Sequence, residues 1–275
     1  MHKLKFAGVQ MDVAIGDFQK NLDRIEQYAR TIAAKGAWLT VFPECTTTGY
    51  CFESLEEALP FAEPVDGPAF NRIWELCKEL QTRIVYGFLE SSGGEIFNSI
   101  SLVGPDGLVG TYRKVHLPML GIDRFTTAGD KFAVFETDGI KIGLCICYDS
   151  SFPESARVMA LDGADVIVLP TNWPPTSGLT ADVIPAARAL ENHVYFLAVN
   201  RVGNERGFEF IGKSSFCSPS GKVLVQADHN CEEILYAEFN PLISRNKHLV
   251  NIPGQHEVHR IQDRCPGSYA RIQSK

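Results

Sequence analysis

The amino-acid sequence contains no block of Lys and Arg residues, and its 26 basic side chains are outnumbered by 33 acidic ones, for a net charge of −7. Nucleic-acid-binding proteins normally gather basic residues in a patch or stripe, so this charge pattern argues against nucleic acid as a partner. The sequence also lacks an apolar run of the roughly 18 residues that a membrane span needs. We therefore expect no nucleic-acid partner and no membrane partner.

The N-terminal residues lack the continuous apolar stretch of a secretory signal. Disulfide frameworks are typical of small secreted domains, whereas the eight cysteines here are scattered along a chain of ordinary size. Reduced thiols in a cytoplasmic protein are therefore the better interpretation. The Cys145-x-Cys147 spacing has no His/Cys pair nearby that would complete a zinc site, so we predict no metal.

What the sequence does contain is an ordinary globular composition, with 45% hydrophobic and 21% charged residues. A chain of 275 residues should bury about three quarters of the surface that it exposes when unfolded. No linker or change of composition divides residues 1–240, which we predict to form one domain. Residues 241–275 are polar and contain Pro and Gly, and we predict an irregular tail that packs on the domain or on a partner subunit.

Strand-like and helix-like segments alternate along the chain. Apolar residues at helical spacing predict a helix over 18–34, and Gly67-Pro68 is a typical start for another. Further helices are expected at 153–161 and 179–192. Strands are expected at 4–11, 38–42, 83–89, 96–103, 108–114, 131–137, 140–147, 164–169, 194–200, 212–217, 222–227 and 233–239. This pattern predicts an α/β protein with mixed sheets.

Three strand-like runs are each followed or ended by a reactive side chain: Glu44, Lys114 and Cys147. Active sites of α/β proteins usually gather at strand ends, so these three side chains are candidates to converge in space. Each one also has a structural interpretation. A glutamate after a strand is often solvated, a lysine leaving a hairpin is often exposed, and a cysteine in an apolar strand is often a small core residue.

Three sequence blocks favour the catalytic interpretation: FPECTTTGY at 42–50, YRKVHLP at 112–118 and GLCICYDSSFPE at 143–154. In this order they resemble the nitrilase superfamily of carbon–nitrogen hydrolases. The resemblance extends from about residue 4 to residue 240 and includes LPTNWP at 169–174 and RALENHVYFLAVNRVG at 188–203. It implies a four-layer αββα sandwich, in which two mixed β-sheets pack face to face with helices outside.

The resemblance also implies roles for the three residues. Cys147 is similar to the family's nucleophile, and Glu44 to the general base that takes the thiol proton. Lys114 would stabilise the oxyanion of the tetrahedral intermediate, together with the backbone N–H of Tyr148. The implied reaction is amide hydrolysis through a thioester, with a small-molecule amide as substrate and with no cofactor.

One segment departs from the family pattern. Many members have a second glutamate shortly after the lysine block, whereas this chain has GIDRFTTAGD at 121–130, with Asp123 as its only early acid. Asp123 either replaces that glutamate or pairs with Arg124 or Lys131 on a loop. Both interpretations stay open at this point.

Four further residues are candidates for the substrate pocket. Asn172 and Trp173 follow an apolar strand in the loop where this family's pocket usually lies, although a turn that caps the core is an equal alternative. Tyr50 and Phe152 are candidate wall residues beside the first and third blocks.

The particular activity is read from the residues after the nucleophile. Tyr148-Asp149 resembles the amidase branches, including the ω-amidase-like group, whereas true nitrilases commonly have Trp-Glu there. N-carbamoyl amide hydrolases are the nearest alternative, and they would need a cation such as Arg201 or Arg206 for a substrate carboxylate. A nitrilase is third.

Two other classes of protein are also considered. A non-catalytic relative would be expected to lack a catalytic residue, and a cysteine protease would use a His such as His116 as its base. The family commonly assembles as homodimers or larger homo-oligomers.

Overall fold

Two six-stranded sheets form the centre of the computed structural model, which describes residues 3–273. The first sheet has the order β14-β1-β2-β3-β4-β5 and the second the order β13-β12-β9-β8-β7-β6. The strands of the first sheet are β1 (Leu4–Gln10), β2 (Leu39–Val41), β3 (Arg83–Ser92), β4 (Glu95–Gly104), β5 (Gly107–Arg113) and β14 (Glu233–Phe239). Those of the second are β6 (Ala133–Thr137), β7 (Ile140–Leu144), β8 (Val166–Thr171), β9 (Tyr195–Asn200), β12 (Ser215–Cys217) and β13 (Val223–Gln226).

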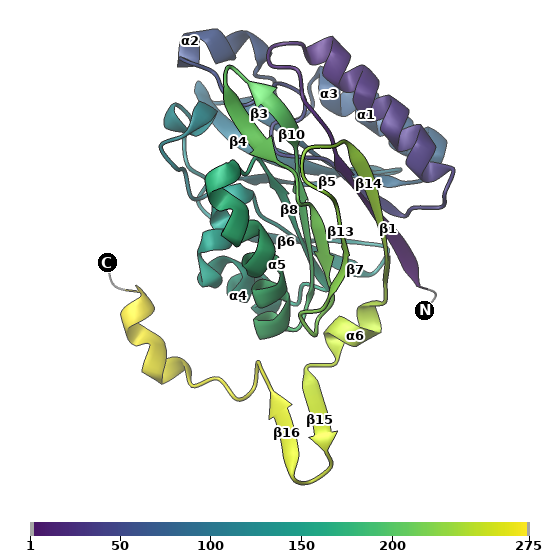
Figure 1. Ribbon diagram of the computed structural model, residues 1–275, viewed down its shortest axis with the longest axis vertical. Coiled ribbons are helices and arrows are strands. Elements are labelled where there is room, and N and C mark those ends of the chain that lie inside the picture. The colour runs from purple at the N-terminus through teal and green to yellow at the C-terminus, as the bar shows by residue number, and fades with distance from the viewer. Residues whose placement is uncertain (1–2, 274–275) are drawn as a thin grey trace.

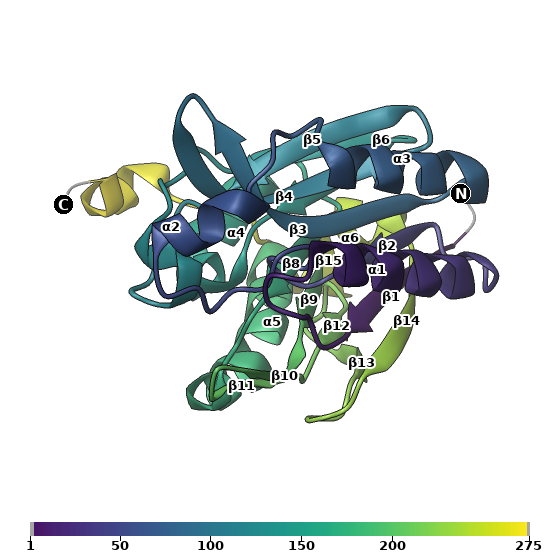
Figure 2. The ribbon, with the colours of Figure 1, turned by 90° about the horizontal axis from the view of Figure 1, so that it is seen from above.

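Four long helices cover the outer faces of the two sheets. Helices α1 (Phe18–Ala33) and α3 (Pro68–Leu80) lie on the first sheet, while α4 (Pro153–Leu161) and α5 (Gly178–Asn192) lie on the second (Figures 1 and 2). Apolar side chains from both sheets fill the space between them, among them Phe6, Val41, Leu144 and Val168. The arrangement is the αββα sandwich, so the predicted fold class is confirmed.

Strands in which apolar residues show no clear spacing, and very short elements, were not predicted. They include a hairpin of β10 (Val202–Glu205) and β11 (Phe208–Ile211), which pairs outside both large sheets. The short helical segments are α2 (Leu55–Ala58), η1 (Leu59–Phe61), η2 (Gly121–Arg124) and η4 (Pro175–Ser177). The strand expected over 140–147 ends at Leu144, because the chain turns at Cys147 into a 3₁₀ segment, η3 (Cys147–Ser151).

The prediction that residues 241–275 form an irregular tail is wrong, because much of the tail has regular secondary structure. The tail contains α6 (Pro241–Arg245), a hairpin of β15 (His248–Ile252) and β16 (His256–His259), and a last 3₁₀ segment, η5 (Pro266–Gln273). Asn240 caps α6 by accepting a hydrogen bond from the Leu242 N–H at 3.1 Å, and Gly254 has the positive φ of 69° that the hairpin turn uses. The Pro and Gly residues therefore mark a cap and a turn, and the hairpin projects beyond the sandwich (Figure 1).

Within residues 3–273, no helix combines the length and the apolar character that a membrane crossing requires.

Candidate active site

The three predicted reactive residues lie just beyond strand ends that meet at one edge of the sandwich. Glu44 follows β2, which is parallel to β3. Lys114 follows β5, which runs in the same direction as β3 because two antiparallel pairings separate them. Cys147 follows β7, which is parallel to β8 and lies in the second sheet. The topology thus delivers side chains from both sheets to a common region.

Lys114 lies between two carboxylates in a wholly buried cluster. Its Nζ is 2.7 Å from Glu44 Oε1 and 2.5 Å from Asp123 Oδ2. The Asn98 amide donates to both acids, at 2.7 Å to Glu44 Oε1 and 2.8 Å to Asp123 Oδ1, and the Tyr50 hydroxyl donates to Asp123 Oδ2 at 2.7 Å. Asp123 therefore belongs to this cluster and is not paired with Arg124 or Lys131 on an exposed loop.

Burial and neighbouring charges set the protonation of the cluster. Burial raises the pKa of the Glu44 carboxyl, Lys114 acts in the opposite direction, and Asp123 adds to the rise. Burial alone would lower the pKa of the Lys114 ammonium, but Asp123 and Glu44 outweigh it and hold that pKa well above its ordinary value. Lys114 is therefore a fixed cation at neutral pH, and Glu44 holds a proton more readily than an exposed glutamate does.

The backbone of Cys147 adopts an uncommon conformation. Its φ is 43°, in the left-handed region that a residue with a Cβ rarely adopts. Burial, and after it the negative charge of Glu44, raises the pKa of its thiol to about 12. The charge of Lys114 and hydrogen bonds from the Thr171 side chain and the Asn172 N–H act in the opposite direction. The resting thiol is therefore protonated at neutral pH and needs a base before it can attack.

A glycine on the neighbouring strand allows the Glu44 loop to approach the sheet. A Cβ on Gly87 would lie 2.4 Å from the backbone nitrogen of Cys45 and 2.8 Å from the carbonyl oxygen of Pro43. Cys45 itself has a φ of 49°, which turns the chain directly after the glutamate. The loop can therefore close onto β3 only because this position has no side chain.

Asn172 faces the same region from the end of β8. Its Nδ2 donates to the carbonyl oxygen of Glu44 at 3.2 Å, which fixes the amide plane. In the part of the chain that the structure describes, two buried acceptors here have no hydrogen-bond partner: Asn172 Oδ1 and Glu44 Oε2. Unpaired buried acceptors are costly, so their concentration around one thiol indicates a place for hydrogen-bond donors of a ligand.

The other predicted pocket residues lie in different environments. Trp173 is buried, and its backbone N–H donates to Asn200 Oδ1 at 2.8 Å, which ties it to the core. Tyr50 is buried against the charged cluster. Phe152 is half-buried and stacks on the His116 ring with centroids 3.7 Å apart.

Arg201 and Arg206, considered as carboxylate binders, also differ. Arg201 is fully buried and pairs with Asp12 and Glu205, so its charge is already used within the fold. Arg206 is partly exposed and pairs with Glu57. It lines a cavity of about 270 Å³ together with residues of η2, the segment that carries Asp123.

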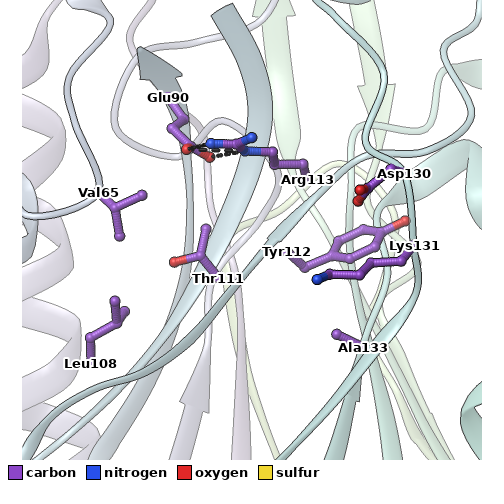
Figure 3. Close-up of a pocket in the computed structure, with 9 residues that line it drawn as sticks. All are labelled: Val65, Glu90, Leu108, Thr111, Tyr112, Arg113, Asp130, Lys131 and Ala133. Carbon is purple, nitrogen blue, oxygen red and sulfur yellow. Dashed lines mark hydrogen bonds and ion pairs between the residues drawn. The ribbon is translucent and has the colours of Figure 1, made fainter. Parts of the chain in front are cut away.

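A larger cavity of about 440 Å³ opens between the edge strands β5 and β6 (Figure 3). The buried Glu90 carboxylate accepts hydrogen bonds from Arg113 at its upper end, and Asp130 and Lys131 stand on the opposite side. Its lining includes none of Glu44, Lys114 and Cys147, so it is separate from the cluster around the thiol.

Two residues around the site were not predicted from the sequence to belong to it. Asn98 lies in the middle of β4 and holds both acids of the cluster. Asp149 is wholly buried two residues after Cys147 and accepts a hydrogen bond from the Ile146 N–H at 2.9 Å. A polar side chain within an apolar strand, as at Asn98, is the one signal that points to such a residue.

Comparison with known proteins agrees with this fold. The carbon-nitrogen hydrolase family matches residues 5–245. A nitrilase of Pyrococcus abyssi is 39% identical over 250 residues, covering 90% of this chain and 93% of the relative. An omega-amidase of Xenopus tropicalis is 32% identical over 220 residues, covering 76% of this chain and 79% of the relative. A solved CN-hydrolase superfamily protein from Xanthomonas campestris has a TM-score of 0.80 at 26% identity, covering 89% of this chain and 93% of that chain.

The chain belongs to the carbon-nitrogen hydrolase family. The resemblance to the nitrilase superfamily that the three sequence blocks predicted is thereby confirmed. The protein is a hydrolase that acts on carbon–nitrogen bonds other than peptide bonds, with amidases among its relatives.

Proposed function

We propose that the protein hydrolyses a small amide through a thioester on Cys147, releasing ammonia or an amine and a carboxylic acid. The observation that carries this proposal is the buried Lys114 between Glu44 and Asp123, next to a protonated thiol. Such a cluster supplies a base, a fixed cation and a nucleophile within one water-poor site.

In the proposed cycle, Glu44 takes the thiol proton as the sulfur of Cys147 attacks the amide carbon. Lys114 and the backbone N–H of Tyr148 stabilise the resulting oxyanion. Glu44 then passes the proton to the departing nitrogen, the C–N bond breaks, and a thioester remains. Water, activated by Glu44, attacks the thioester carbon and releases the acid, and the proton returns to the sulfur. Asp123 keeps Lys114 charged and oriented throughout.

Unpaired acceptors support an amide over a nitrile. An amide nitrogen with two hydrogens offers two N–H donors, and Asn172 Oδ1 and Glu44 Oε2 are buried acceptors without partners in the described chain. A nitrile nitrogen offers no N–H donor, so it would leave both acceptors unpaired at a cost of about 1–3 kcal/mol each. In this proposal Asn172 binds the leaving nitrogen, while Trp173, Tyr50 and Phe152 shape the walls.

An N-carbamoyl amide is the second candidate substrate. Its ureido group would use the same acceptors, and its carboxylate would need a cation at some distance from the thiol. The cavity of about 270 Å³ beside η2 contains Arg124 and Arg206, but Glu53 and Glu205 also line it and Arg206 is paired with Glu57, so this substrate ranks after a simple amide.

The experiment that tests the proposal is a substrate panel scored by ammonia release. We expect turnover of ω-amides and short aliphatic amides to exceed that of N-carbamoyl amino acids, and nitriles to be slowest. Asn172→Ala should reduce kcat/KM for amides by about tenfold, since about 1–2 kcal/mol of hydrogen bonding is lost. Faster turnover of nitriles than of amides would refute the substrate assignment.

We further propose that the protein forms a homodimer or a larger homo-oligomer in a reducing, cytoplasmic environment. All eight cysteines are free, which supports the reducing environment. Large apolar side chains are exposed along α4 and α5 and on the tail: Val158, Leu161, Leu179, Val183, Leu190, Val250, Ile252 and Ile272. Apolar residues gathered on one helix layer beside a projecting hairpin favour a second copy of this chain as the occupant.

Sedimentation equilibrium would measure the assembly directly. Val183→Glu places a charge on the exposed face of α5 and should shift the mass toward that of a single chain. Leu59→Glu, at a similarly exposed apolar residue on η1, is the control and should leave the mass unchanged. A single-chain mass for the unmodified protein would refute the assembly.

A further inference from the structure

One buried carboxylate connects the turn that carries the thiol to the strand end that carries the catalytic lysine. Asp149 Oδ2 accepts the Ile146 N–H at 2.9 Å and the Tyr112 hydroxyl at 2.7 Å. Asp149 Oδ1 accepts the His116 backbone N–H at 3.0 Å, and His116 Nδ1 lies 2.8 Å from the same oxygen. Four contacts from two chain segments therefore converge on a side chain that is fully buried.

The spacing of the partners around the lysine is informative. Tyr112 and His116 lie two residues before and two residues after Lys114. The carboxylate therefore anchors the chain on both sides of that residue, through the Tyr112 hydroxyl and the His116 backbone N–H. Ile146 immediately precedes Cys147, so the same carboxylate holds the entry to the thiol turn. A displacement of either segment would break hydrogen bonds to Asp149.

The thiol turn needs such support because its conformation is unfavourable. Cys147 adopts a φ of 43°, and a non-glycine residue in this region costs of the order of 1 kcal/mol or more unless its surroundings impose it. Two hydroxyls add to the restraint: Ser150 donates to the Cys147 carbonyl at 2.7 Å, and Ser155 donates to the Asp149 carbonyl at 2.8 Å. Asp149 is the only one of these groups that also reaches the lysine segment among the contacts described.

Two of the side chains that contact Asp149 are held in place by their surroundings. Burial, and after it Asp149 itself, raises the pKa of the Tyr112 phenol, so its hydroxyl keeps its proton. The His116 ring is held against Phe152 by stacking, with ring centroids 3.7 Å apart, which fixes Nδ1 toward the carboxylate. Tyr112 and His116 thus form a rigid support for the acid.

We propose that Asp149 is a positioning residue, which sets the placement of the Cys147 thiol relative to Lys114 and Glu44 by clamping the two segments together. The inference rests on the proposed roles of Cys147 and Lys114. Asp149 acts through these residues, and its carboxylate is fully occupied by the protein's own donors. Its loss should therefore lower kcat and thiol reactivity without weakening substrate binding.

Asp149→Asn is the test variant, because asparagine keeps the shape but offers one oxygen where the native residue offers two. In either orientation of the amide, an NH₂ group faces donors from Ile146 and Tyr112 or from His116. A misplaced reacting group typically costs about a hundredfold, so kcat should fall by about that factor, with KM within twofold. Alkylation of Cys147 by iodoacetamide, resolved by peptide mass spectrometry, should slow in parallel. The exposed Cys231 and Cys265 serve as internal references and should react at unchanged rates.

Asp165→Asn is the matched control. Asp165 is also buried and lies at the other end of the second sheet. It accepts hydrogen bonds from the Lys141 N–H at 3.0 Å and from Arg245 Nε at 2.8 Å. This variant should lose stability but keep kcat and the alkylation rate of Cys147. A second variant, Tyr112→Phe, removes only the hydroxyl, which donates to Asp149 at 2.7 Å and accepts the Val115 N–H at 3.3 Å. It should lower both rates by about three- to tenfold, which corresponds to about 1 kcal/mol.

The outcomes separate positioning from a purely structural role. Parallel losses of kcat and of Cys147 alkylation in Asp149→Asn and Tyr112→Phe support the inference, and Tyr112→Phe decides alone if Asp149→Asn does not fold. Unchanged kcat and alkylation rate in the folded variants overturn it, whatever happens to stability. Failure of the proposed function looks different, because turnover would then survive Cys147→Ala in a protein with native Asp149.

Discussion

Cys147→Ala is expected to lower amide turnover by at least about ten-thousandfold, because removal of a covalent nucleophile costs that much or more in comparable hydrolases. The reason is specific to this thiol. It lies beside the Glu44–Lys114–Asp123 cluster, and without its sulfur the proposed thioester cannot form. The fold should survive, since the change removes one buried atom and Ala accepts the same backbone as Cys. Steady-state ammonia release, together with a thermal melt of the variant, measures both effects.

Cys145→Ala provides the matched control for this prediction. Cys145 is also buried, two residues earlier, but its sulfur faces the Val168 carbonyl at 3.6 Å inside the second sheet. Its replacement should cost a little stability and leave kcat/KM within about twofold, since a buried small-residue change costs of the order of 1 kcal/mol. Equal losses in the two variants, or more than one per cent residual turnover in Cys147→Ala, would contradict a thioester on Cys147.

The layers and the three reactive residues could be predicted because both depend on short-range patterns. Long amphipathic helices such as α1 and apolar strands such as β8 carry their period in consecutive residues, and the structure places both where the sequence predicts. Glu44, Lys114 and Cys147 each lie within three residues of the end of a strand. Their convergence then follows from the common direction of the strands.

The residues that complete the site could not be predicted, because their partners are distant in the chain. Asn98 bonds Glu44 across 54 positions, and Tyr112 bonds Asp149 across 37, so neither contact has a local signature. The left-handed φ of Cys147 also has no signature in the apolar residues before it, which explains why the strand was expected to continue through it. The hairpin in the tail has a similar origin, since its turn was visible as Pro-Gly but its strand pairing was not.

Lys114→Met is expected to reduce both activity and stability, for two separate reasons. Loss of the proposed oxyanion donor should lower kcat by about a hundred- to a thousandfold. Loss of the cation also leaves Glu44 and Asp123 as buried carboxyls without a counter-charge, and breaking a buried pair in this way costs about 3–5 kcal/mol. Urea unfolding at neutral pH would measure the second effect. Lys3→Met, which removes an exposed pair with Glu238, is the control and should leave the unfolding midpoint unchanged.

The pH dependence of the Lys114→Met defect gives a stricter test of its cause. Lys114 lowers the pKa of Glu44 in the native protein, so its removal raises a pKa that burial already holds above the ordinary 4.5. The folded state then binds more protons than the unfolded state above pH 4.5, and stability falls as pH rises through the raised pKa. The defect should therefore be small near pH 4.5 and grow as the pH rises toward neutral. Adding Glu44→Gln removes one of the stranded charges, so the double variant should be more stable than Lys114→Met at neutral pH while remaining inactive. A defect that is independent of pH and is not relieved by Glu44→Gln would show that lost packing, not uncompensated charge, causes the instability.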